Sequence, residues 1–333
     1  MKITWKVSTI LLILVMMVLS GCKTGQTPSM EEPTKAPTIA VEPTETSVSI
    51  TETNPDWWKT AVFYEIFVRS YNDSNGDGIG DFNGITMMLD YLNDGDHSTK
   101  TDLGITGIWL MPIFPSPSYH GYDVTDYQAV NPEYGTLDDL KNLLTEAHKR
   151  GIRIIIDFVI NHTSSQHPWF KSAVDLDSPY RDYYVWSDTN PGYAGPWGQT
   201  VWIPSKNGYY YALFWDQMPD LNFRNPEVTE EIFDATRFWL EDVGVDGFRV
   251  DAARHLVENG EVQINTPETH DWFKSWRTYY KAIAPDAMAI GEVWDSTANI
   301  TKYLRGDELD LAFNFDLADS WVGGVSGGTG NVI

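Results

Sequence analysis

Short apolar runs alternate with longer amphipathic segments along the chain after residue 56. The run RIIIDFVI at 153–160 is nearly continuous in its apolar character, which is typical of a strand buried on both faces of a parallel sheet. From such runs we predict six strands, at 61–68, 107–111, 153–160, 245–250, 288–293 and 311–315.

The segments between these strands have a helical period. Thr136 and Asp139 form a capping-box pattern ahead of leucines at helical spacing, and Gly151 follows the basic end of that segment. We predict a helix here and others at 228–242, 266–283 and 297–304. Repeated strand–helix alternation predicts a parallel sheet, open or closed into a barrel, with its chemistry at the carboxyl ends of the strands.

Residues 164–223 interrupt this alternation. They are rich in Trp, Tyr, Pro and Gly and show no helical period. A long irregular segment inside a compact domain is usually functional. We therefore predict a small inserted domain at 163–223, within a catalytic domain that runs over 56–333.

The first 55 residues have the composition of a targeting segment and a tether. Lys2 and Lys6 precede an apolar run, Val7 to Leu19, that is too short to span a bilayer comfortably. The run ends in LSGC, which resembles the lipobox of bacterial lipoproteins, so we expect a signal peptide at 1–22 and lipidation of Cys22. An ordinary signal peptide and a short anchor helix are the alternatives. Residues 23–55 are dominated by Thr, Pro and Glu and predict a disordered tether. Together these features predict an extracytoplasmic protein anchored by lipid to the bacterial cell membrane.

The net charge of −24 narrows the possible partners. A surface this acidic repels nucleic acid and anionic membrane, so we expect a neutral substrate or a cation and no nucleic acid. The sequence indicates no protein partner.

The stretch DSNGDGIGD at 73–81 has the oxygen spacing of a calcium loop. Positions 1, 3, 5, 7 and 9 of such a loop are occupied here by Asp73, Asn75, Asp77, the carbonyl of Ile79 and Asp81. The twelfth position lacks the glutamate of an EF-hand, and a predicted strand precedes the loop. We therefore predict a Ca²⁺ loop of another type; the alternative is a solvated Asp/Gly turn.

Polar residues fall at the predicted strand ends, where the fold would place its chemistry. They are Asp157, Asn161 and His162 on the third strand, Arg249 and Asp251 on the fourth, and Glu292 on the fifth. Two carboxylates on one rim can cleave a glycosidic bond, one as nucleophile and one as acid. Arg249 would keep Asp251 ionised, and the apolar neighbours of Glu292 would raise its pKa.

Five motifs in order resemble the α-amylase family of glycoside hydrolases, family thirteen. They are YHGYDVTDY (119–127), DFVINH (157–162), MPDLN (218–222), GFRVDAARH (247–255) and GEVW (291–294). The resemblance runs from about residue 57 onward and implies a (β/α)8 barrel with a small domain inserted after the third strand. It further implies a retaining reaction, in which the two carboxyl groups lie about 5–5.5 Å apart.

The resemblance assigns roles to individual residues. Asp251 would be the nucleophile and Glu292 the acid/base. The substrate-binding residues would be Arg249, His162, Tyr122, His120 and His255, with Tyr122 stacked on the first sugar. The 73–81 loop would be a structural calcium clamp. A second calcium site would use Asn161, Asp220 and the carbonyl of His255.

Three features favour α-1,4 linkages within this family. Ala252 follows the nucleophile, His255 has the amylase form, and MPDLN resembles the group intermediate between oligo-1,6-glucosidases and neopullulanases. We therefore expect an α-amylase acting on starch or maltodextrins. The alternatives are a glucosidase or neopullulanase-like maltodextrin hydrolase, and a non-catalytic surface protein that binds glycans.

The family's fourth region, a His-Asp pair after the seventh strand, is not found in this sequence, and only six of eight strands are predicted. We therefore expect a fragment of a longer protein. Our prediction is that residues 56–333 alone do not hydrolyse starch, because the carboxylate that stabilises the transition state is missing. A reducing-sugar assay on that segment tests this, and clear turnover would contradict it.

Overall fold

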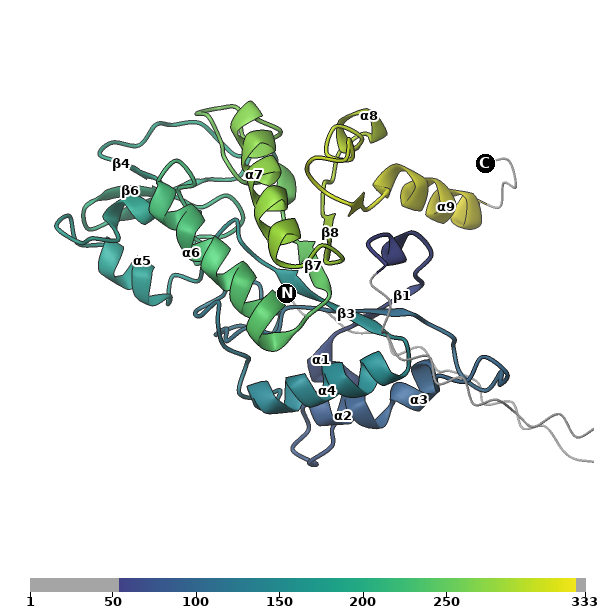
Figure 1. Cartoon of the computed structure of the whole chain (residues 1–333). Helices are drawn as coiled ribbons and strands as arrows, with labels where there is room; N and C mark the ends of the chain where they lie inside the picture. The colour runs from purple at the N-terminus through teal and green to yellow at the C-terminus, as the bar shows by residue number, and fades with distance from the viewer. Residues whose placement is uncertain (1–53, 328–333) are drawn as a thin grey trace, which may run out of the picture. The chain divides into compact units, whose positions relative to one another are not determined.

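The computed structural model describes residues 54–327 (Figure 1). The predicted signal peptide, the predicted lipidation site at Cys22 and the predicted tether up to residue 53 lie outside the described residues. Among the helices that are described, none combines the length and the apolar character needed to cross a membrane.

Six parallel strands form one sheet in the order β1-β2-β3-β7-β8-β9. The strands are β1 (Phe63–Ile66), β2 (Gly107–Leu110), β3 (Arg153–Phe158), β7 (Gly247–Val250), β8 (Met288–Gly291) and β9 (Leu311–Ala312). Each pairs with the next in sequence order, and the sheet curls into a half-barrel, so the prediction of an incomplete (β/α)8 barrel is confirmed. Every strand except β2 is two or more residues shorter than predicted.

Helices follow the strands of the sheet along the chain. They are α1 (Val68–Tyr71), α2 (Phe82–Met87), α3 (Leu89–Leu92), α4 (Leu137–Lys149), α6 (Pro226–Arg237), α7 (Pro267–Ile283), α8 (Thr297–Ile300) and α9 (Phe315–Gly327). Single turns of 3-10 helix lie at η1 (Trp57–Lys59), η2 (Arg181–Tyr183) and η4 (Ala253–His255), and a π-helical turn, η3 (Phe238–Val243), continues α6. Figure 1 shows α2 beside α4 and α6 beside α7, and α4 also contacts β3.

The sequence located the long helices better than the short ones. The capping box of Thr136 and Asp139 is present at the start of α4, as predicted. Helices α1, α2 and α3 have six residues or fewer, so no helical period can be read from them. The segment after β9, where we predicted no helix, forms α9 with none of its residues buried.

The residues of the predicted insertion form their own sheet. Strands β4 (Trp186–Ser187), β6 (Gly208–Tyr211) and β5 (Trp202–Ser205) pair antiparallel in that order, and α5 (Pro168–Ala173) precedes them. The helix was not predicted, since its six residues are too few to show a period. The insertion starts directly after β3, so it stands at the carboxyl end of the parallel strands.

Aromatic side chains fill the space between the sheet and helices α6 and α7. Phe158 stacks on Phe248 at 4.7 Å, and Trp276 lies against both. The indole N–H of Trp276 donates to Thr236 Oγ1 at 3.0 Å, and that of Trp239 donates to the carbonyl of Tyr127 at 2.7 Å. These large rings are thus buried without leaving an unsatisfied donor.

Strands β7 and β8 approach each other closely at Gly247. A Cβ added to this residue would lie 2.1 Å from the carbonyl oxygen of Met288. The contact is with backbone, which cannot move aside as a flexible side chain can. The strand pair that carries both predicted catalytic carboxylates therefore depends on glycine at this position.

We expect Gly247→Ala to destabilise the protein by about 1–3 kcal/mol, since it forces atoms into a packed backbone. Thermal unfolding followed by circular dichroism would show a Tm lowered by several degrees. Gly323→Ala in α9 is the matched control, because nothing lies within 4 Å of its added Cβ. Equal Tm values for the two variants would contradict the close-approach argument.

Candidate active site

Four charged residues meet at the carboxyl ends of three adjacent strands. Asp157 lies in β3 and Arg249 in β7, and the strand register places them directly opposite each other. Asp251 follows the last residue of β7, and Glu292 follows the last residue of β8. Backbone bonds continue the ladder past these strand ends, from Asp251 N to Phe158 O at 3.3 Å and from Glu292 N to Val250 O at 2.9 Å. The strands thus fix the carboxylates in place.

Arg249 joins all three carboxylates through one guanidinium. Its Nη1 donates to Asp157 Oδ1 at 2.8 Å and to Asp251 Oδ1 at 2.7 Å. Its Nη2 lies 3.0 Å from Glu292 Oε2. The Arg249 side chain is 5% exposed and that of Asp157 is fully buried. Asp251 and Glu292 are therefore held side by side on one rigid planar group; their catalytic roles stay a prediction.

Aromatic rings enclose this guanidinium. Its carbon lies 5.1 Å from the centroid of the Trp109 ring, 5.8 Å from that of Tyr122 and 6.0 Å from that of Phe313. A cation near aromatic faces is stabilised by their quadrupoles, most strongly where water is excluded. The rings thereby limit the solvent that can screen the ion pairs.

Burial and neighbouring charges shift the pKa values of Glu292, Asp157 and Arg249. Desolvation raises the pKa of Glu292, and the negative charge of Asp251 raises it further against the opposing effect of Arg249. Burial likewise raises the pKa of Asp157 to about 7, although Arg249 pulls in the other direction. Burial lowers the pKa of Arg249, but Asp157 and Asp251 outweigh it and the net shift is upward. The guanidinium therefore stays charged beside a glutamate that holds its proton more readily than usual.

The backbone turns sharply after Asp251. Ala252 has the left-handed conformation, with φ 50° and ψ 30°, which few residues other than glycine adopt. In this conformation its backbone N–H donates to Glu292 Oε2 at 3.3 Å. Ala252 thus links the end of β7, which carries Asp251, to the side chain of Glu292.

Tyr122 lies beneath the rim and is held on three sides. Its hydroxyl donates to Asp157 Oδ2 at 3.2 Å, and its ring is stacked on that of His120 at 6.0 Å. Its backbone N–H donates to His120 Nδ1 at 3.1 Å, and its carbonyl accepts from His162 Nε2 at 3.0 Å. Burial lowers the pKa of His162 to about 4, so this imidazole is neutral at pH 7. Both histidines orient Tyr122 here; their direct contact with a sugar stays a prediction.

His255 is also committed to neighbours. Its Nδ1 donates to the carbonyl of Gln263 at 3.0 Å, and its Nε2 accepts from Arg254 Nε at 3.0 Å. Burial, helped by Arg254, lowers the pKa of this histidine to about 4. His255 is buried and both of its ring nitrogens have partners, and its contact with substrate stays a prediction.

The structure adds Asp157 to the predicted set. The sequence placed this residue at a strand end but gave it no role in the site. In the structure it binds both Arg249 and Tyr122 and so connects the two halves of the pocket. Its position opposite Arg249 was the available signal, but that pairing follows only once the strand register is known.

The predicted calcium loop consists of successive side chain-to-backbone turns. Asp73 accepts from the backbone N–H groups of Gly76 and Gly78 at 2.6 and 2.7 Å, and these bonds lower its pKa. Asn75 and Asp77 each accept from the N–H two residues on, at 2.8 Å. Asp81 caps α2 through the Gly84 N–H and also accepts from Ser74. The oxygen donors suit calcium, but among the described residues no three acidic or histidine side chains converge as a metal-binding group.

The second predicted metal site contains an unsatisfied oxygen. Asn161 Nδ2 donates to Asp220 Oδ2 at 2.8 Å, which leaves the buried Asn161 Oδ1 without a hydrogen-bond partner. Burial, reinforced by Glu258, raises the pKa of Asp220 well above its usual value. An unpaired oxygen beside a buried carboxyl group is chemically suited to a hard cation. The metal at this site stays a prediction.

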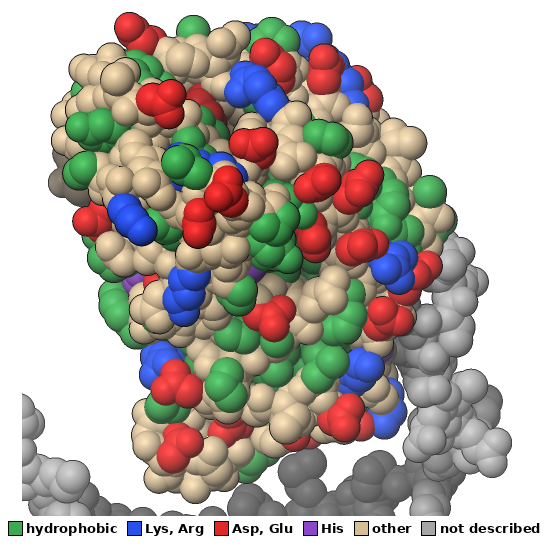
Figure 2. Space-filling model, turned by 90° about the vertical axis from the view of Figure 1, so that its left-hand side faces the viewer, with side chains coloured by type: hydrophobic (Ala, Val, Ile, Leu, Met, Phe, Trp, Pro, Cys, Tyr) green, Lys and Arg blue, Asp and Glu red, His purple; other side chains and the backbone are tan. Residues whose placement is uncertain are grey.

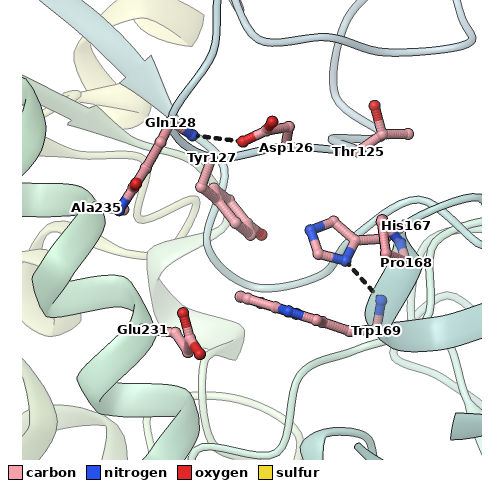
Figure 3. Close-up of a pocket in the computed structure, with 9 residues that line it drawn as sticks. All are labelled: Thr125, Asp126, Tyr127, Gln128, His167, Pro168, Trp169, Glu231 and Ala235. Carbon is pink, nitrogen blue, oxygen red and sulfur yellow. Dashed lines mark hydrogen bonds between the residues drawn. The ribbon is translucent and has the colours of Figure 1, made fainter. Parts of the chain in front are cut away.

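A further pocket lies on the outer side of the barrel, and neither Asp251 nor Glu292 lines it (Figure 3). It has a volume of about 260 Å³ and is lined by Tyr127, His167, Trp169 and Glu231, among others. The hydroxyl of Tyr127 already donates to two carbonyls, and His167 Nδ1 accepts from the Trp169 N–H. Its polar groups thus support the start of the insertion.

Figure 2 shows one face of the molecule, where acidic side chains are spread over the surface, as the net charge implies.

Comparison with known proteins agrees with this geometry. The sequence profile of the family described as "Alpha amylase, catalytic domain" matches residues 65–327. Alpha-amylase 3 of Dictyoglomus thermophilum is 49% identical over 274 residues, which cover 82% of this chain and 51% of that protein. A glucan 1,6-alpha-glucosidase of Streptococcus pneumoniae is 39% identical over 269 residues, which cover 78% of this chain and 48% of that protein.

A solved structure supports the same relationship. The crystal structure of the alpha-amylase from H. orenii superposes with a TM-score of 0.73 at 48% identity and covers 80% of this chain and 54% of that one. The chain spans about half the length of the curated relatives it matches. Profile, identity and superposition agree over most of the chain, and it therefore belongs to the α-amylase family of glycoside hydrolases.

Proposed function

We propose that the protein carrying this chain hydrolyses α-1,4-glucosidic bonds of starch and maltodextrins with retention of configuration. The observation that carries the proposal is the guanidinium of Arg249, which holds Asp251 and Glu292 together at adjacent strand ends. A retaining glycosidase needs one ionised and one protonated carboxyl group at short separation. The upward shift in the pKa of Glu292 is consistent with that division of roles.

The proposed reaction has two displacements. Asp251 attacks the anomeric carbon while Glu292 transfers its proton to the departing glucosidic oxygen. The ionised Glu292 then takes a proton from water, which attacks the glycosyl–enzyme ester and releases Asp251. Arg249 orients Asp251 for this attack through its hydrogen bond to Oδ1.

The linkage preference rests on narrower observations. Ala252 leaves a small side chain beside the nucleophile, and the alpha-amylase of Dictyoglomus thermophilum is 49% identical. The second candidate is an α-1,6-acting glucosidase, which the 39% identity to the streptococcal enzyme favours. Internal cleavage of amylose would support the first candidate. Hydrolysis of isomaltose without cleavage of amylose would support the second.

We also propose that the protein is exported and anchored through a lipid on Cys22, because LSGC follows a short apolar run. Radiolabelled palmitate should enter the wild-type chain and fail to enter Cys22→Ser. Equal labelling of both would contradict the proposal.

In the whole protein that carries this chain, we expect Glu292→Gln to lower kcat on maltooligosaccharides by about 10²–10⁴-fold, the usual contribution of a general acid. The loss should be smaller for an aryl glucoside whose leaving group needs no proton. Because the acid must be protonated, the wild-type kcat/KM should fall as pH rises through the pKa of Glu292. That alkaline limb should disappear in the variant with the aryl substrate. Persistence of the limb would assign the acid to another residue.

We further propose that loop 73–81 binds calcium through Asp73, Asn75, Asp77 and the Ile79 carbonyl. The support is the run of oxygen donors and the charge that backbone N–H groups maintain on Asp73. Calcium that binds only the folded protein stabilises it by about 2.7 kcal/mol at a hundred times Kd.

Calcium should therefore raise the Tm of the wild type by several degrees relative to EDTA, and Asp73→Ala should abolish the difference. Asp96→Ala is the matched control, since Asp96 is an exposed aspartate whose pKa is lowered by similar local hydrogen bonds. A calcium effect that survives in Asp73→Ala would place the ion elsewhere. No effect in the wild type would leave the loop as a solvated turn.

A further inference from the structure

A short turn of the insertion carries an exposed tryptophan. Ala194 and Thr200 pair across the turn, Gly195 N donates to Gln199 O at 2.8 Å, and Gly198 N donates to Gly195 O at 2.9 Å. At its tip, the Trp197 side chain is 59% exposed. Most residues with so large an apolar surface are buried, so its exposure calls for an explanation.

The turn is rigid because one glutamine side chain fills it. Gln199 Oε1 accepts from the Trp197 N–H at 3.0 Å, and Gln199 Nε2 donates to the Leu213 carbonyl at 3.0 Å. Gly198 has a φ of +80°, a conformation that favours glycine. The backbone therefore holds Trp197 in one place.

A second bond ties this turn to the barrel. Gln263, in the loop between β7 and α7, donates from Nε2 to the carbonyl of Ala194 at 3.0 Å. The same loop residue accepts from His255 Nδ1 through its own carbonyl. The position of Trp197 is thus set relative to the strand that carries Arg249 and Asp251.

Trp197 lies at the edge of the catalytic site. Its ring centroid is 5.8 Å from that of Phe214 and 5.8 Å from that of His255. Phe214 in turn lies 5.5 Å from His162 and is itself 39% exposed. Aromatic rings therefore lead from His162, beside Tyr122, through Phe214 to Trp197. Among the described aromatic pairs, Trp197 pairs with Phe214 and with His255.

We propose that Trp197 is a platform for a glucose unit of the substrate that lies outside the catalytic pocket, and that it gives the enzyme its preference for long α-glucans. This inference rests on the proposed function. The C–H face of a glucopyranose is apolar and packs against an indole without any charge partner, which suits a neutral polymer. A platform that is held rigid before binding loses little conformational entropy when the glucan binds.

A remote platform of this kind has a defined kinetic signature. It contacts the substrate equally in the ground state and in the transition state, so its loss should raise KM and leave kcat unchanged. The effect should appear only with substrates long enough to reach it.

The test is binding of maltoheptaose and of maltose to the full chain, measured by isothermal titration calorimetry. We expect Trp197→Ala to weaken maltoheptaose about tenfold and to leave maltose unchanged. Trp197→Phe should restore most of the affinity, because it keeps an aromatic face. Trp321→Ala is the matched control, since Trp321 is 57% exposed on α9.

The possible outcomes distinguish a failure of the Trp197 proposal from a failure of the proposed function. If Trp197→Ala binds both sugars as the wild type does, or weakens both equally with a lowered Tm, Trp197 is not a platform and the inference fails while the function stands. If the wild type binds neither sugar, the proposed function itself fails for this chain. A selective loss for maltoheptaose supports both.

Discussion

The guanidinium of Arg249 compensates three carboxyl groups that are largely removed from water. A buried carboxylate without a partner would take up a proton, and a cluster of three would do so more readily because each charge disfavours the others. Arg249 contacts Asp157, Asp251 and Glu292 at once, from a side chain that is 5% exposed. Its single positive charge is too small to hold all three ionised. The pKa of Asp157 and that of Glu292 are therefore both raised, and of these two only Glu292 stands at a strand end where its side chain is partly exposed.

The fold makes this arrangement possible by aligning strand ends. Parallel pairing puts Asp157 opposite Arg249, and the close approach at Gly247 holds β7 against β8. The insertion then adds Phe214 and Trp197 over the same rim. Each layer depends on the previous one. The strand register positions the charged groups, and these groups together with burial shift one another's pKa values.

Much of the fold could be predicted from the sequence because its signals are local. Continuous apolar runs identify buried parallel strands, and the capping box at Thr136 identifies a helix start without reference to the rest of the chain. Asp251 and Glu292 could be predicted because each follows an apolar run. The helices α1, α2 and α3 could not, since a period needs more residues than they contain.

The missed features of the site depend on contacts between distant segments. The role of Asp157 follows from strand register, and the exposure of Trp197 follows from a turn fixed by Gln199 and Gln263. In the loop at 73–81, Asp81 also serves as a helix cap, which the spacing of oxygen donors does not reveal. Sequence patterns identify which residue types are present, but the partner of each polar atom is decided by tertiary structure.

The central claim is that Glu292 holds its proton more readily than an ordinary glutamate because it is buried beside Asp251. Its direct test is a carbon-13 NMR titration of the Glu292 carboxyl group in the wild-type chain and in Asp251→Asn. The account predicts a pKa above the ordinary glutamate value in the wild type, and a lower value in the variant that stays raised by burial. A wild-type pKa at or below the ordinary value, or one that Asp251→Asn leaves unchanged, would contradict it.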